Sequence, residues 1–266
     1  MLNLMPAEEK VHSSADEPTR RSVCAASLHA VLMACLFQQS ARADALEGTL
    51  KWSLRPWLSR LDEASVALSS GTIKSRDWQR EVEDTLGKVE LNDFLRSLDF
   101  ERLAAAARFP SEGEGMQRLY FLEEGGRLQP LRFRPFLFTL KKGAAVVPHG
   151  HHNMATMHMV LDGRARVRHF DRIETTSTHM MIRTAADVVG SPGEVTSISD
   201  EHQNIHWFEA LSDRVFMFNI GVYQVRPGPF GERDYVDPLG GTSVGGGMMR
   251  AARLDRAAAY AKYGHV

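Results

Sequence analysis

The chain has 266 residues, of which 43% are hydrophobic, and a formal net charge of −1. That length supports one substantial core with appendages, and the near-zero charge excludes a global electrostatic attraction to nucleic acid or anionic membranes. No apolar run in the body of the chain reaches the length of a transmembrane helix.

Residues 1–43 have the pattern of an export signal. Arg20 and Arg21 precede a mostly apolar run, 23–37, and the segment ends in Ala41-Arg42-Ala43. A charged start, a short apolar stretch and a small-x-small end are typical of a signal peptide. The paired arginines favour the twin-arginine route, so the sequence predicts a periplasmic or secreted protein that begins near Asp44.

Two other interpretations of this segment stay open. An amphipathic helix of a cytoplasmic protein is the alternative, and His29 inside the apolar run supports it. Leu32-Met33-Ala34-Cys35 faintly resembles a lipoprotein cleavage box. Cys24 and Cys35 are the two cysteines, so a chain cleaved at Ala43 contains no disulfide.

Residues 44–110 are predicted to be helical. Pro56 suits the first turn of a helix whose apolar face continues to Leu68, and Gly71 ends it. Further helices are expected from Ser75, through 91–98 and through 103–106. Trp57 and Trp78 are expected to be packing anchors. Residues 111–115 form a polar linker.

Residues 116–240 change to the period of a β-strand. Asp162-Gly163 is a hairpin turn signal, and the many short strands favour a sandwich or barrel. The strands are expected within 132–139, 154–161, 165–170, 178–182, 195–198, 205–210 and 215–222. Residues 241–266 are predicted to be a tail of glycine-rich loops with a short helix within 251–262.

Three histidines have the spacing of a metal site. His149 and His151 are two residues apart, so both side chains point to one face of a strand. His206 follows 55 residues after His151, and three convergent imidazoles can hold one divalent ion. His202 lies four residues before His206, and strand periodicity alone does not separate the two.

The other histidines lack this spacing. His152 is expected at the surface or behind the ligands, and His158 on the opposite face from His151, either packed or facing solvent. His169 and His179 are expected at the surface. A serine hydrolase is not favoured, because the Gly-x-Ser-x-Gly match at 241–245 lies in the glycine-rich tail with no predicted strand before it. A zinc finger is not favoured because cysteine ligands are lacking.

The spacing around these histidines resembles the first cupin motif, Gly-x5-His-x-His-x3-4-Glu-x6-Gly. Gly143, His149, His151 and Gly163 fall in register. Ala155 or Thr156 stands where the family has its carboxylate ligand, and His206 is the part of the second motif that matches. The resemblance implies a mainly β cupin barrel (a double-stranded β-helix, or jelly roll) over 116–240, with the helical region before it.

A cupin with three histidines and no carboxylate resembles the thiol dioxygenases: cysteine dioxygenase, cysteamine dioxygenase and the plant cysteine oxidases. The last two share His-x-His-x2-Met, here His149 to Met154, and Asn-Ile/Leu-His-x-Phe, here Asn204 to Phe208. The resemblance implies one Fe(II) ion, held by His149, His151 and His206, and oxidation of a thiolate by O2 to a sulfinate. Tyr223 stands where the family places a tyrosine, and Asn219 is nearest to its acidic residue.

Two other functions remain open at this stage. A cupin lyase or isomerase would use the metal as a Lewis acid on a carboxylated small molecule, and a non-catalytic cupin would bind a small molecule or a metal. In each case the expected partner is a small molecule and not nucleic acid, and the sequence leaves a homodimer open.

Overall fold

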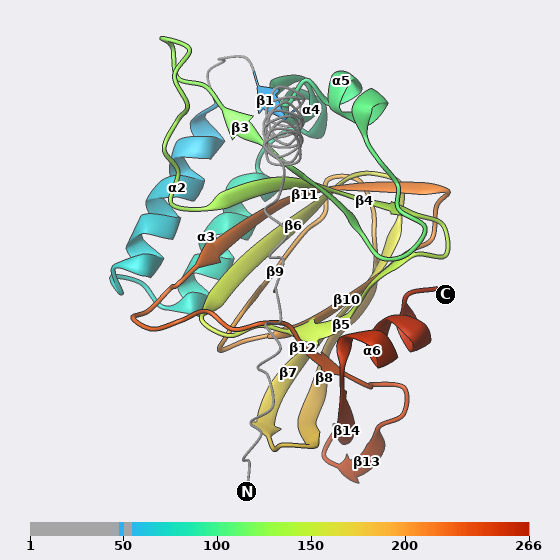
Figure 1. The fold of residues 1–266 in the computed structure, drawn as a ribbon. Helices are drawn as coiled ribbons and strands as arrows, with labels where there is room; N and C mark the ends of the chain where they lie inside the picture. The colour runs from blue at the N-terminus through green and yellow to red at the C-terminus, as the bar shows by residue number, and fades with distance from the viewer. Residues whose placement is uncertain (1–47, 51–54, 266) are drawn as a thin grey trace, which may run out of the picture. The chain divides into compact units, whose positions relative to one another are not determined.

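A computed structural model describes residues 48–50 and 55–265, and the predicted export signal, 1–43, lies outside these residues (Figure 1). None of the helices described is long and apolar enough to cross a membrane. The helices are α2 (Pro56–Ser69), α3 (Ser75–Gly87), α4 (Leu91–Ser97), α5 (Phe100–Ala106) and α6 (Arg256–Tyr263).

Most of the described chain after residue 114 is β-strand. Two short strands, β1 (Thr49–Leu50) and β3 (Tyr120–Phe121), pair with each other in parallel. The remaining strands are β2 (Gly115–Arg118), β4 (Arg134–Lys141), β5 (Ala145–Gly150), β6 (Met154–Asp162), β7 (Ala165–Thr175), β8 (His179–Gly190), β9 (Val195–Ser199), β10 (Ile205–Ala210), β11 (Arg214–Tyr223), β12 (Asp234–Val236), β13 (Thr242–Gly245) and β14 (Met248–Leu254).

Strands β4 to β11 form a jelly roll. One sheet has the order β2-β4-β11-β6-β9, and the other has the order β12-β5-β10-β7-β8-β14-β13. The antiparallel sets β4-β11-β6-β9 and β5-β10-β7-β8 therefore contain eight successive strands in the order of a double-stranded β-helix. The structure confirms the predicted cupin barrel and the helical region before it.

The second sheet closes on itself beyond the jelly roll. Strand β12 pairs with β5 on one side and with β14 on the other. This closure encloses a small apolar cluster that consists of Phe170, Met180, Ile182, Ile205, Val236 and Ala251. Part of the C-terminal tail therefore belongs to the second sheet of the barrel.

The prediction for the C-terminal tail was wrong in part. Residues 242–254, expected as loops and the start of a helix, form β13 and β14, and α6 begins only at Arg256. Met248 to Ala252 pair with residues 183 to 179 of β8. This pairing outweighs the helix propensity of the alanines, because propensity is weak beside tertiary contacts.

The helical region covers the outer face of the five-stranded sheet. Helix α2 begins at Pro56, a residue suited to the first helical position. Its Trp57 ring lies 4.7 Å from the ring of Phe94 in α4 and 5.8 Å from that of Phe218 in β11. Trp57 is therefore the packing anchor that the sequence predicts, and it joins the helices to the sheet.

The opposite face of this sheet lines the barrel interior. Along β11, Phe216 and Phe218 point to the helices, whereas Val215 and Met217 pack in the interior core. Continuing the alternation of a strand places Asn219 on the interior side as well. The interior therefore changes from apolar to polar along a single strand.

Candidate metal centre

Three histidine side chains from neighbouring strands converge inside the barrel. His149 lies in β5, His151 follows it by two residues, and His206 pairs with His149 from β10. Their ligand nitrogens all lie within 4.8 Å of one another. These residues are 1%, 9% and 3% exposed, respectively. Among the described residues, no aspartate, glutamate or cysteine belongs to this group.

A β-bulge in β5 directs His149 inward. His206 pairs with His149, but Phe208 pairs with Val146, so β5 has one residue more than β10 over this stretch. Val146 and Phe208 both pack in the interior core. The extra residue shifts the alternation, so His149 faces inward like Val146 although it lies an odd number of positions, three, after it. Pro148 lies within this irregular stretch, where a missing backbone N–H is tolerated.

The Asn204 side chain links the two histidine segments. Its Nδ2 donates to the carbonyl oxygens of His151, at 2.9 Å, and Ser199, at 3.2 Å. A Cβ at Gly150 would lie only 2.4 Å from Asn204 Oδ1. The glycine between the two histidines therefore leaves the space in which the asparagine holds His151 beside β10.

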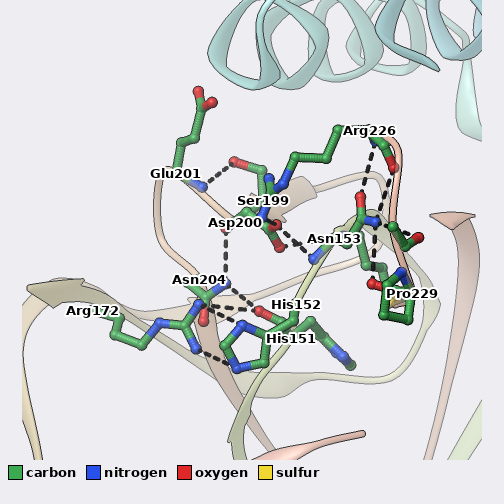
Figure 2. Close-up of polar contacts among 12 residues, drawn as sticks. His151, His152, Asn153, Arg172, Ser199, Asp200, Glu201, Asn204, Arg226 and Pro229 are labelled. Atoms are coloured by element: carbon green, nitrogen blue, oxygen red, sulfur yellow. Dashed lines mark hydrogen bonds and ion pairs between the residues drawn. The ribbon is translucent and has the colours of Figure 1, made fainter. Parts of the chain in front are cut away.

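Asn153 fixes the turn that follows His151. Its φ of 55° reverses the chain from β5 into β6, and its N–H donates to Asp200 Oδ2 at 2.6 Å. Its side chain Nδ2 donates to the carbonyls of Arg226, Gly228 and Pro229 (Figure 2). The turn thereby holds the segment that continues into Phe230–Arg233, which lines the histidine cavity.

The three imidazoles are neutral at neutral pH. Burial is the largest cause in each case: it lowers the pKa of His149 and His206 well below the usual value and that of His151 to about 3. The charge of Arg233 acts in the same direction on His149 and His151. Neutral imidazoles offer a lone pair each, which is the form that binds metals.

The donor set fits a divalent ion. His149 Nδ1 donates to the carbonyl oxygen of Val147 at 2.7 Å, which leaves the lone pair on Nε2. That Nε2 lies 3.0 Å from Nε2 of His206. Two metal–nitrogen bonds of about 2.1 Å at a right angle place their nitrogens about 3 Å apart. His149, His151 and His206 could therefore hold one ion without a change of backbone.

Uncharged side chains occupy the wall opposite the histidines. Thr156 in β6 lines the cavity, whereas Ala155 packs on the helical side of the same strand. Asn219 Nδ2 donates to Thr156 Oγ1 at 2.6 Å, and Thr156 Oγ1 donates to the carbonyl of Ile220 at 2.7 Å. Thr156 is therefore the residue at the glutamate position of the cupin motif that faces the site.

The cavity between these walls has a volume of about 210 Å³. This is smaller than the roughly 300–1,000 Å³ of pockets for drug-sized ligands, so it suits a small molecule. Tyr223 lines it beside Asn219, and the Arg134 guanidinium lies 4.8 Å from the centre of its ring. Burial raises the pKa of Tyr223 above its usual value of 10, so its hydroxyl stays protonated at neutral pH.

His158 lies inside the barrel beside the candidate ligands. Its ring packs 4.7 Å from that of Phe208 and 5.2 Å from that of His206, and its Nδ1 is buried with no hydrogen-bond partner. The expectation that it faces away from His151 was wrong. The turn at Asn153 puts β6 in the other sheet, so alternation counted from β5 does not carry across it.

The structure also separates the remaining histidines. His202 lies before β10 with Nδ1 3.1 Å from Asp171, outside the group of three. His152 pairs with Asp234 away from the ligand cluster. His169 was expected at the surface, and this expectation was wrong. It is 1% exposed and lies inside the barrel, where its Nδ1 is 2.6 Å from Gln203 Oε1.

Arg233 is a cavity residue that the sequence did not reveal. It lines the cavity from the segment before β12, and its Nη2 donates to Glu114 Oε1 at 2.6 Å. No motif surrounds it, and it lies 27 residues after His206 in a stretch without clear periodicity. Only the folded chain brings this guanidinium beside the histidines.

Comparisons with known proteins concern the fold. No family model and no curated protein sequence matches the chain. Among solved structures, the chain is similar to a cupin superfamily protein from Desulfitobacterium hafniense, with 18% identity and a TM-score of 0.32 over 46% of this chain and 87% of that one. It is also similar to an oxalate oxidase, with 15% identity and a TM-score of 0.33 over 46% and 55%.

The chain is also similar to two 11S globulins. Procruciferin, an 11S globulin from Brassica napus, has 16% identity and a TM-score of 0.31 over 39% of this chain. The chain spans 23% of procruciferin and 26% of an 11S globulin from Wrightia tinctoria. The strand order of the barrel itself carries the assignment of the fold.

Proposed function

We propose that the protein is a metal-dependent cupin in which His149, His151 and His206 bind one divalent ion. The observation that carries this proposal is the convergence of three buried, neutral imidazoles whose ligand nitrogens lie within 4.8 Å of one another. Burying imidazoles without partners costs stability. The Nε2 atoms of His149 and His206 face each other at 3.0 Å, so a role in binding an ion is a better explanation of this cluster than packing.

We further propose that the ion is Fe(II) and that the enzyme oxidises a small thiol, R–SH + O2 → R–SO2H, in which both oxygen atoms of O2 are added to sulfur. The bound ion would supply the redox chemistry that couples O2 to the thiolate. The support is the resemblance of the segments 149–154 and 204–208 to thiol dioxygenases, together with the absence of a carboxylate from the group of three histidines.

The chain's own residues suit an anionic substrate. Thr156 and Asn219 are hydrogen-bonded to each other and carry no charge, so these two residues supply no anion opposite the histidines. Glu232, the carboxylate that lines the cavity, is next to Arg233 in the chain. Three neutral imidazoles leave the charge of an ion uncompensated, which favours a thiolate or a carboxylate nearby. Tyr223 would donate a hydrogen bond to this anion because its hydroxyl is protonated.

Arg233 supports a second candidate function. Its guanidinium lines the cavity, and a guanidinium pairs well with carboxylates. A cupin lyase or isomerase that acts on a carboxylated small molecule would use the same site, with the ion as Lewis acid. Turnover of such a substrate would not require O2.

Metal analysis followed by oxygen uptake tests these proposals. The full chain, purified and loaded with Fe(II) without oxygen, should hold about one ion and consume one O2 per sulfinate formed from cysteine or 2-aminoethanethiol. His206→Ala should lose both, and His202→Ala is the matched control that should keep both. Retention of metal by His206→Ala would exclude this ligand set, and O2-independent turnover of a carboxylated substrate would favour the second function.

We also propose export of the mature chain from near Asp44, on the strength of the sequence of residues 1–43 alone. N-terminal sequencing of the protein recovered from cell fractions tests this proposal. A periplasmic or secreted chain that begins near Asp44 supports it, and Arg20→Lys with Arg21→Lys should then block export. A cytoplasmic chain that keeps Met1 contradicts it.

A further inference from the structure

A groove lies beside the histidine cavity, along α6. It has a volume of about 1110 Å³, and Glu114, Tyr235 and Tyr260 are among its lining residues. Arg233 lines both the groove and the histidine cavity. The groove is therefore a separate hollow that shares a wall with the candidate metal centre, and the proposed reaction makes no use of it.

Glu114 places a buried carboxylate in this groove. Its side chain is 5% exposed, and Oε1 accepts a hydrogen bond from Arg233 Nη2 at 2.6 Å. Its other oxygen, Oε2, is buried and has no hydrogen-bond partner. A carboxylate oxygen that is removed from water without a donor is destabilising. A ligand that donates a hydrogen bond to Oε2 would remove this cost.

Two glycines hold Glu114 in place. Gly113 has a φ of 69°, and a Cβ there would lie 2.9 Å from Cε1 of Tyr260. A Cβ at Gly115 would lie 2.2 Å from Oγ1 of Thr139. Both contacts need glycine, so the turn fits closely between α6 and β4. The segment 111–115, which the sequence predicts to be a polar linker, thus fixes a carboxylate in the groove wall.

The rest of the groove suits a cation. The rings of Tyr235 and Tyr260 lie 6.3 Å apart. The guanidinium of Arg256 lies 5.3 Å from the centre of the Tyr260 ring, so the Tyr260 ring takes part in one cation–π contact within the protein. The charged lining residues have one more acid than base: Glu112, Glu114 and Glu232 against Arg233 and Arg256.

We propose that this groove binds an organic ammonium ion, a ligand with a protonated primary amine on a short carbon chain. The amine donates to Glu114 Oε2, and the carbon chain lies along Tyr235 and Tyr260. An N–H donor is required because the unpartnered atom is an acceptor. A positive charge is favoured because the acceptor is a carboxylate. The site does not depend on a metal at the histidines.

Calorimetric titration of the full, metal-free chain with n-butylammonium chloride in 0.1 M salt tests the proposal. We expect saturable binding at one site, and at least about tenfold weaker binding of 1-butanol and tetramethylammonium, since a charge-assisted hydrogen bond contributes more than a factor of ten in affinity. 1-Butanol lacks the charge, and tetramethylammonium lacks the N–H. Equal binding of all three would overturn the proposal, as would no saturable binding.

Variants locate the site. Glu114→Gln should weaken n-butylammonium binding by at least about tenfold, and Glu112→Gln, at the rim of the same groove, is the control that should bind as wild type. Since Glu114→Gln removes the partner of Arg233 and could disturb folding, Ala257→Trp provides a second test. Ala257 is exposed on α6 and lines the groove, so a tryptophan there should block binding without touching the ion pair.

A further control separates this site from the histidines. His206→Ala removes a candidate metal ligand on β10 and should bind n-butylammonium as wild type, whatever the outcome of the metal analysis. Loss of binding in His206→Ala would place the amine in the histidine cavity and contradict the groove. Unchanged binding in Ala257→Trp would contradict it as well.

Discussion

The two ends of the barrel interior are built from the same strands and differ in chemistry. At one end, the inward positions of β5, β6 and β11 are Val146, Val160 and Val215, which pack in one apolar core. At the other end, the same strands place His149, Thr156 and Asn219 around a cavity, and β10 adds His206. The same two sheets thus enclose both a packed core and a polar site.

The difference indicates which end contributes most to stability and which end could bind a ligand. Apolar side chains at inward positions contribute to stability through burial and close packing. At the polar end, the Nδ1 atoms of His158 and His206 are buried without partners, and each such group costs about 1–3 kcal/mol. A sequence selected for stability alone would continue the valines, so the polar end points to a ligand.

Removal of one candidate ligand should have the largest effect at the polar end. His149→Ala takes one of three imidazoles from the site and should weaken metal binding by more than about 100-fold, because even the loss of a residue behind a metal ligand costs about 10–100-fold. Competition with a metal-sensitive dye gives the affinity. Unchanged affinity would mean that the polar end does not bind the ion through His149.

The opposite result is expected from the apolar end. Leu140 is fully buried in the interior core, and Leu140→Ala should lower the free energy of unfolding by about 2–5 kcal/mol. The metal content per folded chain should stay as in the wild type. Denaturant unfolding and metal analysis of the same sample measure both quantities. Loss of metal at unchanged stability would mean that the apolar end, like the polar end, is needed for metal binding.

A glutamate at the polar end should sharpen the comparison. Thr156→Glu places a carboxylate opposite the histidines, where it should bind the ion as a fourth protein ligand, raise metal affinity and reduce thiol oxidation. Ala155→Glu is the matched control one residue away. It points to the helices and should cost about 3–5 kcal/mol through an unpaired buried charge. Full activity in Thr156→Glu would mean that the chemistry occurs elsewhere.

Acid should affect the polar end in the metal-free protein. Burial lowers the pKa of His169 to about 4, below the value of about 6.5 in an unfolded chain. The unfolded chain therefore takes up a proton first as pH falls, and this stabilisation is present above pH 6.5 and lost progressively down to about pH 4. Its size is on the order of 3 kcal/mol.

Unfolding in denaturant between pH 7 and 4 measures this loss. His169→Gln should reduce the slope of stability against pH by about one proton, equivalent to about 1.4 kcal/mol per pH unit. Equal slopes in the wild type and His169→Gln would contradict the assignment of His169 as a buried neutral group.

The sequence predicted the barrel strands and the helices well, because their signals are local. The apolar face of α2 follows from periodicity, the mostly apolar run 215–222 contains most of β11, and Asp162-Gly163 marks the turn between β6 and β7. The tail was harder to predict. Strands β13 and β14 depend on pairing with β8, which glycine and alanine content does not reveal.

At the polar end, the sequence identified the three histidines that the structure brings together, but not their surroundings. The bulge at Pro148 and the left-handed turn at Asn153 change the direction of side chains in ways that period counting does not follow. For this reason the inward position of His158 was missed, whereas Arg233 was missed because it lies in a stretch without a motif or clear periodicity. His158 lies in β6, which belongs to the other sheet, and Arg233 precedes β12, which pairs with β5. Only folding brings both side chains to the cavity.

The most direct test is anomalous diffraction at the absorption edge of the bound metal, from crystals of the full chain. The account predicts one peak per chain within bonding distance of nitrogen atoms of His149, His151 and His206, with no protein carboxylate on the ion. A peak at His202 or between His152 and Asp234, or a barrel interior without a peak in protein shown to contain metal, would contradict it.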